Sequence, residues 1–264
     1  PDLLGDRRPR TINMSTIGDA LLHPGDANFG PKVEALVVYN SNPVAVAPES
    51  HKVAKGFARE DLFTVVLEHF MTDTADLADY VLPATTQLEH WDIHGSYGHT
   101  DVLLNRPAIA PEGEARSNAQ IFRDLATQMA KLDPRFAAPH FHDSDEALCR
   151  TAVAGTNVDF DQLLNDGFAS LKLPEAPFPE GGFQTPSGKC EFVSERLAKQ
   201  GISALPDYVP NYELPDANAA FPLAMISPPA RNFLNSTFVN VKSLRNSEGR
   251  PLLEMHPDDA ASRA

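Results

Sequence analysis

Three apolar runs in the first third of the chain constrain its fold more than any other feature. Val33–Tyr39 is rich in β-branched residues and stops at the turn cluster Asn40–Pro43. Leu62–Leu67 is a second continuous apolar run, and Tyr80–Leu82 is a third, which Pro83 ends. Continuous rather than alternating apolar runs are typical of strands that are covered on both faces.

Segments with helical patterns separate these runs. Pro48 suits the first turn of a helix that we expect to reach about Ala58, and Thr72–Ala78 predicts a short helix. Ser117 and Gln120 fit a capping box at the start of a further helix. The apolar side chains of that helix follow at helical spacing, at Ile121, Phe122, Leu125 and Met129. The alternation of strand and helix predicts an α/β fold, with a Rossmann-like parallel sheet and flanking helices.

The second half of the chain is less regular. We expect helices near Asp143–Val153 and Asp159–Leu171, and then a proline-rich connector over Leu173–Phe221. Aromatic side chains in this connector are expected to be buried, namely Phe178, Phe183, Phe192, Tyr208 and Tyr212. Pro222–Ile226 and Leu252–Met255 predict strands of a second, β-rich domain. The predicted divisions are an α/β domain over residues 1–172, a connector over 173–220 and the start of the last domain over 221–264.

Composition excludes several classes of protein. The 264 residues carry a formal net charge of −14, which argues against binding to the backbone of a nucleic acid. No apolar run approaches the roughly 18–20 residues of a membrane-spanning helix. Cys149 and Cys190 are too isolated to build a four-cysteine zinc or iron–sulfur site. We expect two buried free thiols, with a disulfide as the alternative.

Polar residues follow each predicted strand of the sheet. In an open parallel sheet, ligands bind beyond the carboxyl ends of the strands, here at Asn40–Pro43, Glu68–Thr72 and Pro83–Thr86. Glu68 follows its strand directly, and a carboxylate there can hold ribose hydroxyls or the edge of a guanine. A solvated strand end is the alternative interpretation. The first turn has no G-x-G-x-x-G motif, so an ordinary NAD site is not indicated.

Two other polar segments are candidates for ligand contacts. The spacing of His90, His94 and His99 is not a recognised metal-ligand pattern, which favours loop histidines or substrate contacts over zinc. Arg231–Thr237 supplies a guanidinium, two amides and two hydroxyls, which suit a pyrophosphate or the edge of a heteroaromatic ring. The alternative is a polar turn that leads into Phe238.

The segments Thr74–Glu89 (TADLADYVLPATTQLE) and Pro111–Asn118 (PEGEARSN) closely resemble a signature of the large-subunit molybdopterin oxidoreductases, the dimethyl sulfoxide reductase family. Further segments resemble the same family in the same order, namely Thr11–Ile17, Leu36–Pro43, Gln184–Phe192, Phe221–Ser236 and Leu253–Arg263. The resemblance covers nearly the whole chain, and the ordered set is more specific than any single motif.

The resemblance implies a cofactor of molybdenum or tungsten held by two molybdopterin guanine dinucleotides, with an iron–sulfur cluster in an N-terminal part that this chain lacks. The cofactor-binding positions that it implies are Asn42, Pro43, Glu68, His69, Thr72, His90, Asn118, Ser227, Arg231, Asn232, Asn235 and Ser236. His90 stands where a relative can have lysine, and Asn118 where aspartate is common. The metal-ligating residue of the family lies upstream, so we expect no catalytic and no metal-binding residue here. The last domain would begin a double-psi barrel-like, dinucleotide-binding fold.

The same resemblance implies a parent enzyme that transfers an oxygen atom or two electrons at the metal. This chain would bind one guanine dinucleotide arm and would be inactive alone. The expected partners are the remaining domains of the enzyme, an electron-transfer subunit and a small-molecule substrate, without membrane insertion. The alternatives are a metal-free structural or electron-relay subunit of a respiratory complex, and a plain nucleotide-binding α/β protein.

The two ends of the chain lead to a further expectation. The sequence begins at Pro1 without a signal peptide and stops at Ala264, inside a predicted helix. We therefore expect part of a longer polypeptide. We also expect a cytoplasmic rather than a periplasmic location, although this N-terminus carries no signal region that decides it.

Overall fold

A parallel three-stranded sheet forms the centre of the first part of the chain. The computed structural model describes residues 6, 8–178, 180–211 and 220–263. Strands β1 (Ala35–Tyr39), β2 (Phe63–Glu68) and β3 (Tyr80–Pro83) lie in the order β1–β2–β3, with Val37 opposite Val65 and Val65 opposite Tyr80. The predicted α/β class and the parallel sheet are confirmed.

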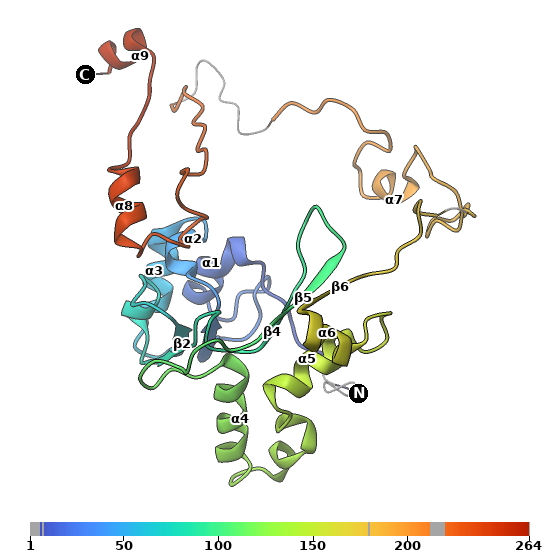
Figure 1. Cartoon of the computed structure of the whole chain (residues 1–264). Coiled ribbons are helices and arrows are strands. Elements are labelled where there is room, and N and C mark those ends of the chain that lie inside the picture. Colours follow the sequence, from blue (N-terminus) through green and yellow to red (C-terminus); the bar gives the residue numbers. More distant parts are fainter. Residues whose placement is uncertain (1–5, 7, 179, 212–219, 264) are drawn as a thin grey trace. The chain divides into compact units, whose positions relative to one another are not determined.

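Short helices and a second set of strands complete the described structure (Figure 1). The α-helices are α1 (Ile17–Leu22), α2 (Pro43–Val46), α3 (Ser50–Phe57), α4 (Asn118–Met129), α5 (Asp145–Val153), α6 (Phe160–Asp166), α7 (Glu195–Ala198), α8 (Lys242–Glu248) and α9 (Pro257–Ala261). The 3₁₀ turns are η1 (Met14–Thr16), η2 (Ala75–Leu77), η3 (Pro134–Ala137) and η4 (Pro139–Phe141). The remaining strands are β4 (Asp92–His94), β5 (Asp101–Asn105) and β6 (Phe168–Ser170).

One face of the parallel sheet packs against α1 and α3, which lie side by side (Figure 1). Val38 and Val66 point from the strands into this core, where they meet Leu21 of α1 and both Val53 and Phe57 of α3. All five side chains are buried. The crossovers from β1 to β2 and from β2 to β3 contribute Ala47 and Ala75 to the same core, so both connections lie on this face.

The other face of the sheet is mostly uncovered. Val37, Phe63 and Tyr80 are 52%, 50% and 61% exposed, although their positions alternate with the buried side chains of the opposite face. Helix α4 covers only the carboxyl end, where the ring of Phe122 packs edge-on against Tyr39 at a centroid distance of 5.9 Å. The expectation of strands covered on both faces therefore holds only at this end of the sheet.

A second, antiparallel sheet, β4–β5–β6, was not predicted. Strands β4 and β5 lie in the segment of His90, His94 and His99, and β6 lies at the end of the predicted helix Asp159–Leu171. Ile93 pairs with Leu104, and Val102 with Ala169, and these side chains turn toward α5 and α6. The buried part of this core consists of Cys149, Val153, Val158, Phe160 and Leu163. The predicted helix Asp159–Leu171 ends at Asp166, because Gly167 adopts a left-handed φ of 81° and β6 follows.

Two other helix predictions are partly correct. Helix α4 begins as predicted, since Ser117 Oγ accepts a hydrogen bond from the backbone N–H of Gln120 at 3.1 Å. The reciprocal half of the capping box is missing, because the side chain of Gln120 donates to Asp124 instead. The predicted helix Thr72–Ala78 is reduced to the single turn η2.

Residues 172–228 form a compact unit of their own, separate from residues 1–171 and 229–264. Neither Pro222–Ile226 nor Leu252–Met255 forms a strand, so both of these predictions are wrong. The predicted burial of the connector aromatics is also wrong for Phe178, Phe192 and Tyr208, which are exposed. Tyr212 lies outside the described residues.

Both cysteines are free thiols, Cys149 buried as predicted and Cys190 exposed, contrary to the prediction. Among the helices of the described residues, none is long and apolar enough to cross a membrane.

Candidate functional site

The carboxyl ends of the three parallel strands bring several of the predicted residues to one edge of the sheet. Strand β1 runs into Asn40, and β2 and β3 end at Glu68 and Pro83. Arg116 then joins this edge, because its backbone N–H donates to Pro83 O at 3.1 Å and its carbonyl accepts from Thr85 N at 3.1 Å. This connection places the start of α4 beside the end of β3.

Asn118, the first residue of α4, reaches back to the end of β1. Its Nδ2 donates to Asn40 Oδ1 at 3.2 Å, and Asn40 has a left-handed φ of 53°, a conformation that asparagine tolerates well. The Oδ1 atom of Asn118 is buried and has no hydrogen-bond partner within the described part of the chain. A buried acceptor without a partner is costly, which makes this atom a candidate acceptor for a ligand donor that reaches the start of α4.

Thr85 joins two histidines at the same edge. Its carbonyl oxygen lies 2.9 Å from His69 Nε2, and its hydroxyl lies 2.9 Å from His90 Nδ1. Thr85 itself is 3% exposed, so these contacts are made in a packed environment. Glu68 precedes His69, and its half-buried carboxylate accepts the backbone N–H of His69 at 2.8 Å. A carboxylate has room for further hydrogen bonds, so Glu68 can still accept donors from a ligand.

Asn42 and Thr72 hold the loops together rather than pointing free groups outward. Asn42 is 6% exposed, and its Oδ1 accepts from the backbone N–H of Thr74 at 3.2 Å and from the Thr74 hydroxyl at 2.7 Å. Its Nδ2 donates to Asp73 at 3.4 Å. Thr72 is buried and its hydroxyl accepts from Ala75 N at 3.2 Å, while Pro43 is the first residue of α2.

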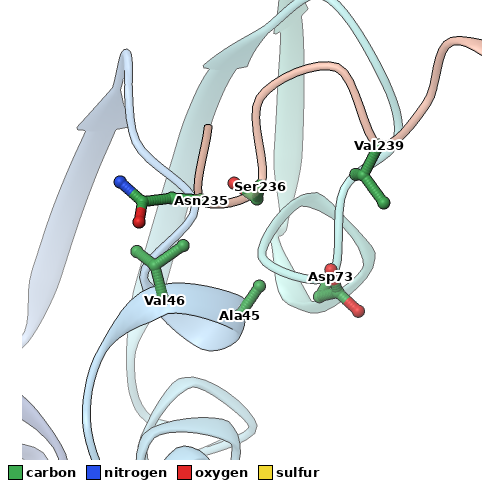
Figure 2. A pocket seen from close by; sticks show the side chains of 6 residues that line it. All are labelled: Ala45, Val46, Asp73, Asn235, Ser236 and Val239. Carbon is green, nitrogen blue, oxygen red and sulfur yellow. The ribbon is translucent and has the colours of Figure 1, made fainter. Parts of the chain in front are cut away.

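A pocket of about 450 Å³ lies next to this network (Figure 2). Ala45 and Val46 of α2, Asp73, and the segment that carries Asn235, Ser236 and Val239 line it. Asn235 and Ser236 form the tip of a tight turn, because Leu234 and Thr237 exchange backbone hydrogen bonds. The φ of 53° at Asn235 explains why asparagine suits this tip. The volume is within the usual range of small-molecule pockets.

Four of the candidate residues are placed elsewhere or are already engaged. Ser227 belongs to the separate unit of residues 172–228. Asn232 donates through its backbone N–H and its Nδ2 to Glu248 Oε2 of α8, at 3.2 and 2.7 Å. These bonds, together with one from the backbone of Arg231, hold the pKa of Glu248 below its usual range. His94 and His99 lie on the β4–β5 hairpin, near Asp92 and Asp101 respectively.

Four further residues organise the site. Asn40 and Thr85 lie inside the predicted strand-end segments Asn40–Pro43 and Pro83–Thr86, although neither was singled out. Asp73 and Glu89 lie outside these segments, and nothing local in the sequence distinguishes them. The contacts of Thr85 and Glu89 extend to His69 and to the backbone of Glu112, which only the fold brings close.

Comparison with known proteins identifies relatives of this chain. A family model described as molybdopterin oxidoreductase matches residues 23–128, which include the sheet and most of α4. The probable oxidoreductase YoaE of Bacillus subtilis (strain 168) is 40% identical over 266 residues, which cover 98% of this chain and 37% of YoaE. The chain belongs to the molybdopterin oxidoreductase family.

Other members of this family match along nearly the whole chain. The dimethyl sulfoxide/trimethylamine N-oxide reductase of Rhodobacter capsulatus is 27% identical over 298 residues, covering 100% of this chain and 36% of the relative. The solved structure of acetylene hydratase from Pelobacter acetylenicus superposes with a TM-score of 0.75 at 26% identity, covering 96% of this chain and 34% of that one. The chain thus spans about a third of the length of these relatives.

Proposed function

We propose that this chain holds one guanine dinucleotide arm of a bis-molybdopterin cofactor in a molybdenum or tungsten oxidoreductase. The proposal rests on the family and on the donors and acceptors at the carboxyl edge of the parallel sheet. A guanine base presents ring N–H and amino donors along one edge, and these need oxygen acceptors. The unpartnered Asn118 Oδ1 and the carboxylate of Glu68 are acceptors of that kind.

The remaining polar groups fit the sugar and phosphate part of such an arm. Asn235 and Ser236 offer an amide and a hydroxyl at the pocket beside α2. His69 donates its Nε2–H to the carbonyl oxygen of Thr85, which leaves Nδ1 of the neutral ring as an acceptor. Where the Thr85 hydroxyl donates to Nδ1 of His90, the Nε2–H of His90 is free to donate. The observation that carries the assignment is the gathering of Asn118 and Glu68 at the carboxyl edge of the parallel sheet, where ligands of such sheets bind.

The bound cofactor would supply oxygen-atom or two-electron transfer at its metal. The residues of this chain would only bind and orient the arm, and so fix where the metal stands relative to the rest of the enzyme. Relatives named as reductases and a relative named as a hydratase share this region. We therefore assign it to cofactor binding and not to the choice of substrate.

A metal-free structural or electron-relay subunit is the alternative function. Such a subunit would have no use for an acceptor at Asn118 or for an acidic strand end at Glu68, and both are in place here. The remaining domains of the enzyme and an electron-transfer subunit belong to the proposal as partners, and so does a cytoplasmic location.

Replacing Glu68 tests the proposed function directly. In the natural polypeptide that contains this chain, Glu68→Ala should lower the content of metal and of guanine nucleotide, because the guanine loses a charged acceptor. Metal is measured by mass spectrometry, and GMP after acid hydrolysis. Glu34→Ala is the matched control, because Glu34 is an exposed glutamate just before β1, at the opposite end of the sheet. Equal cofactor content in the two variants would contradict the role of Glu68.

A further inference from the structure

Glu89 joins two loops through separate oxygen atoms. Its Oε2 accepts from the backbone N–H and the hydroxyl of Thr86, at 2.6 and 2.8 Å, and its Oε1 accepts from the backbone N–H of Glu112 at 2.6 Å. The residue is 7% exposed. These donors, first the backbone N–H of Thr86, hold the pKa of the carboxyl below its usual range. The connection is therefore complete above about pH 4.5 and is lost only as the pH falls through the lowered pKa.

The loop that contains Thr86 carries the histidine contacts of the site. Thr85 stands directly before Thr86 and holds both His69 and His90, and His90 follows Glu89 in sequence. A turn closed by the bond from Glu89 N to Thr86 O, at 3.0 Å, fixes the length of this loop. The hydrogen bonds of Glu89 to Thr86 thus help to hold the turn that carries Thr85 and His90.

The loop that contains Glu112 carries the other half of the site. It leads through Arg116 and Ser117 into α4, whose first residue is Asn118. The pairing of Arg116 with Ala84 and Pro83 joins this loop to β3 close to α4. At its start, the backbone N–H groups of Ala108 and Ile109 donate to Leu88 O at 2.7 and 3.1 Å. Between these two points, Glu89 adds a side-chain connection at Glu112.

We propose that Glu89 is a positioning residue that sets the spacing between the Thr85–His90 pair and Asn118. This inference rests on the proposed function, because that spacing decides whether one guanine dinucleotide arm can contact both groups together. The carboxylate matters here and not only the shape of the side chain. A glutamine has a single oxygen, so its amino group would face the N–H of either Thr86 or Glu112 and leave that N–H without its acceptor.

Glu89→Gln in the natural polypeptide, purified anaerobically with its cofactor, separates positioning from simple stabilisation. We expect amide hydrogen exchange in residues 108–118 to become about tenfold faster, and release of the cofactor, followed as GMP, to become about tenfold faster as well. The matched control is Asp79→Asn. Asp79 also accepts a backbone N–H, that of Thr64 at 2.6 Å, but at the amino end of the sheet.

The outcomes distinguish this inference from the proposed function. If Glu89→Gln releases GMP as slowly as the wild-type protein, the positioning role is overturned. It is also overturned if Asp79→Asn releases GMP as fast as Glu89→Gln. A wild-type protein that contains no GMP would instead overturn the proposed function. If Glu89→Gln does not fold, Thr86→Val replaces it, because that change removes one donor and leaves both backbone bonds. We then expect a smaller increase in the rate of GMP release, and no increase would overturn the proposal.

Discussion

At the scale of single residues, the candidate site depends on Thr85 and Glu89, whose hydrogen bonds position other residues of the site. Strand-end logic and the family signature point to Glu68 and Asn118, whose contacts with a cofactor stay a prediction. The hydrogen bonds of Thr85 and Glu89 could not be predicted, because their partners lie far away in the sequence. Asn42 was predicted as a cofactor contact, yet its amide is bonded to Asp73 and Thr74 in this structure.

The two thiols should differ sharply in reactivity. Burial raises the pKa of Cys149 to about 11, so little thiolate exists there near neutral pH, whereas Cys190 is exposed. At about pH 8, a disulfide reagent should modify Cys190 quickly and Cys149 only after unfolding. Because the folded pKa of Cys149 is raised, its contribution to stability is present below about pH 9 and is lost as the pH rises toward 11.

Rapid modification of both thiols in the folded protein would contradict this account. Cys190→Ala is the control, and it should leave no rapidly reacting thiol.

At the scale of elements, sequence patterns predicted the three strands that pack against α1 and α3. They failed for segments whose secondary structure depends on contacts with distant parts of the chain. Strands β4 and β5 are short and partly polar, so their alternation of Ile93, Val102 and Leu104 was overlooked. Pro222–Ile226 has a strand-like composition, but no strand among the described residues pairs with it. Strand propensity alone does not satisfy the backbone N–H and C=O groups of such a segment.

The contact between α1 and α3 depends on a glycine. A Cβ atom at Gly56 would lie 2.7 Å from Cβ of the buried Leu21, closer than packed carbon atoms approach. Gly56→Ala should therefore lower the free energy of unfolding by about 1–2 kcal/mol, because overpacking outweighs a gain in helix propensity of about 1 kcal/mol. Denaturant unfolding measures this change.

The neighbouring Lys55→Ala on the exposed side of α3 serves as control and should change stability by less than about 0.5 kcal/mol. If Gly56→Ala has the same free energy of unfolding as this control, α1 and α3 can accommodate the added methyl group and the prediction is wrong.

At the scale of the whole molecule, the family resemblance was confirmed, while the domain boundaries stay a prediction. The chain contains a parallel sheet whose carboxyl edge gathers Asn118, Glu68 and the histidines held by Thr85. On the face of this sheet that is turned away from α1 and α3, Val37, Phe63 and Tyr80 remain exposed. The relatives that match are about three times as long as this chain. The experiments are therefore designed for the natural polypeptide that contains it.

The central claim is that this chain binds a guanine-containing molybdenum or tungsten cofactor. The most direct measurement is the metal content and the acid-released GMP of the natural polypeptide that contains this chain, purified without oxygen. The account predicts molybdenum or tungsten together with GMP in the same folded sample. A folded, fully matured protein with neither metal nor GMP would contradict it and would favour the metal-free structural subunit.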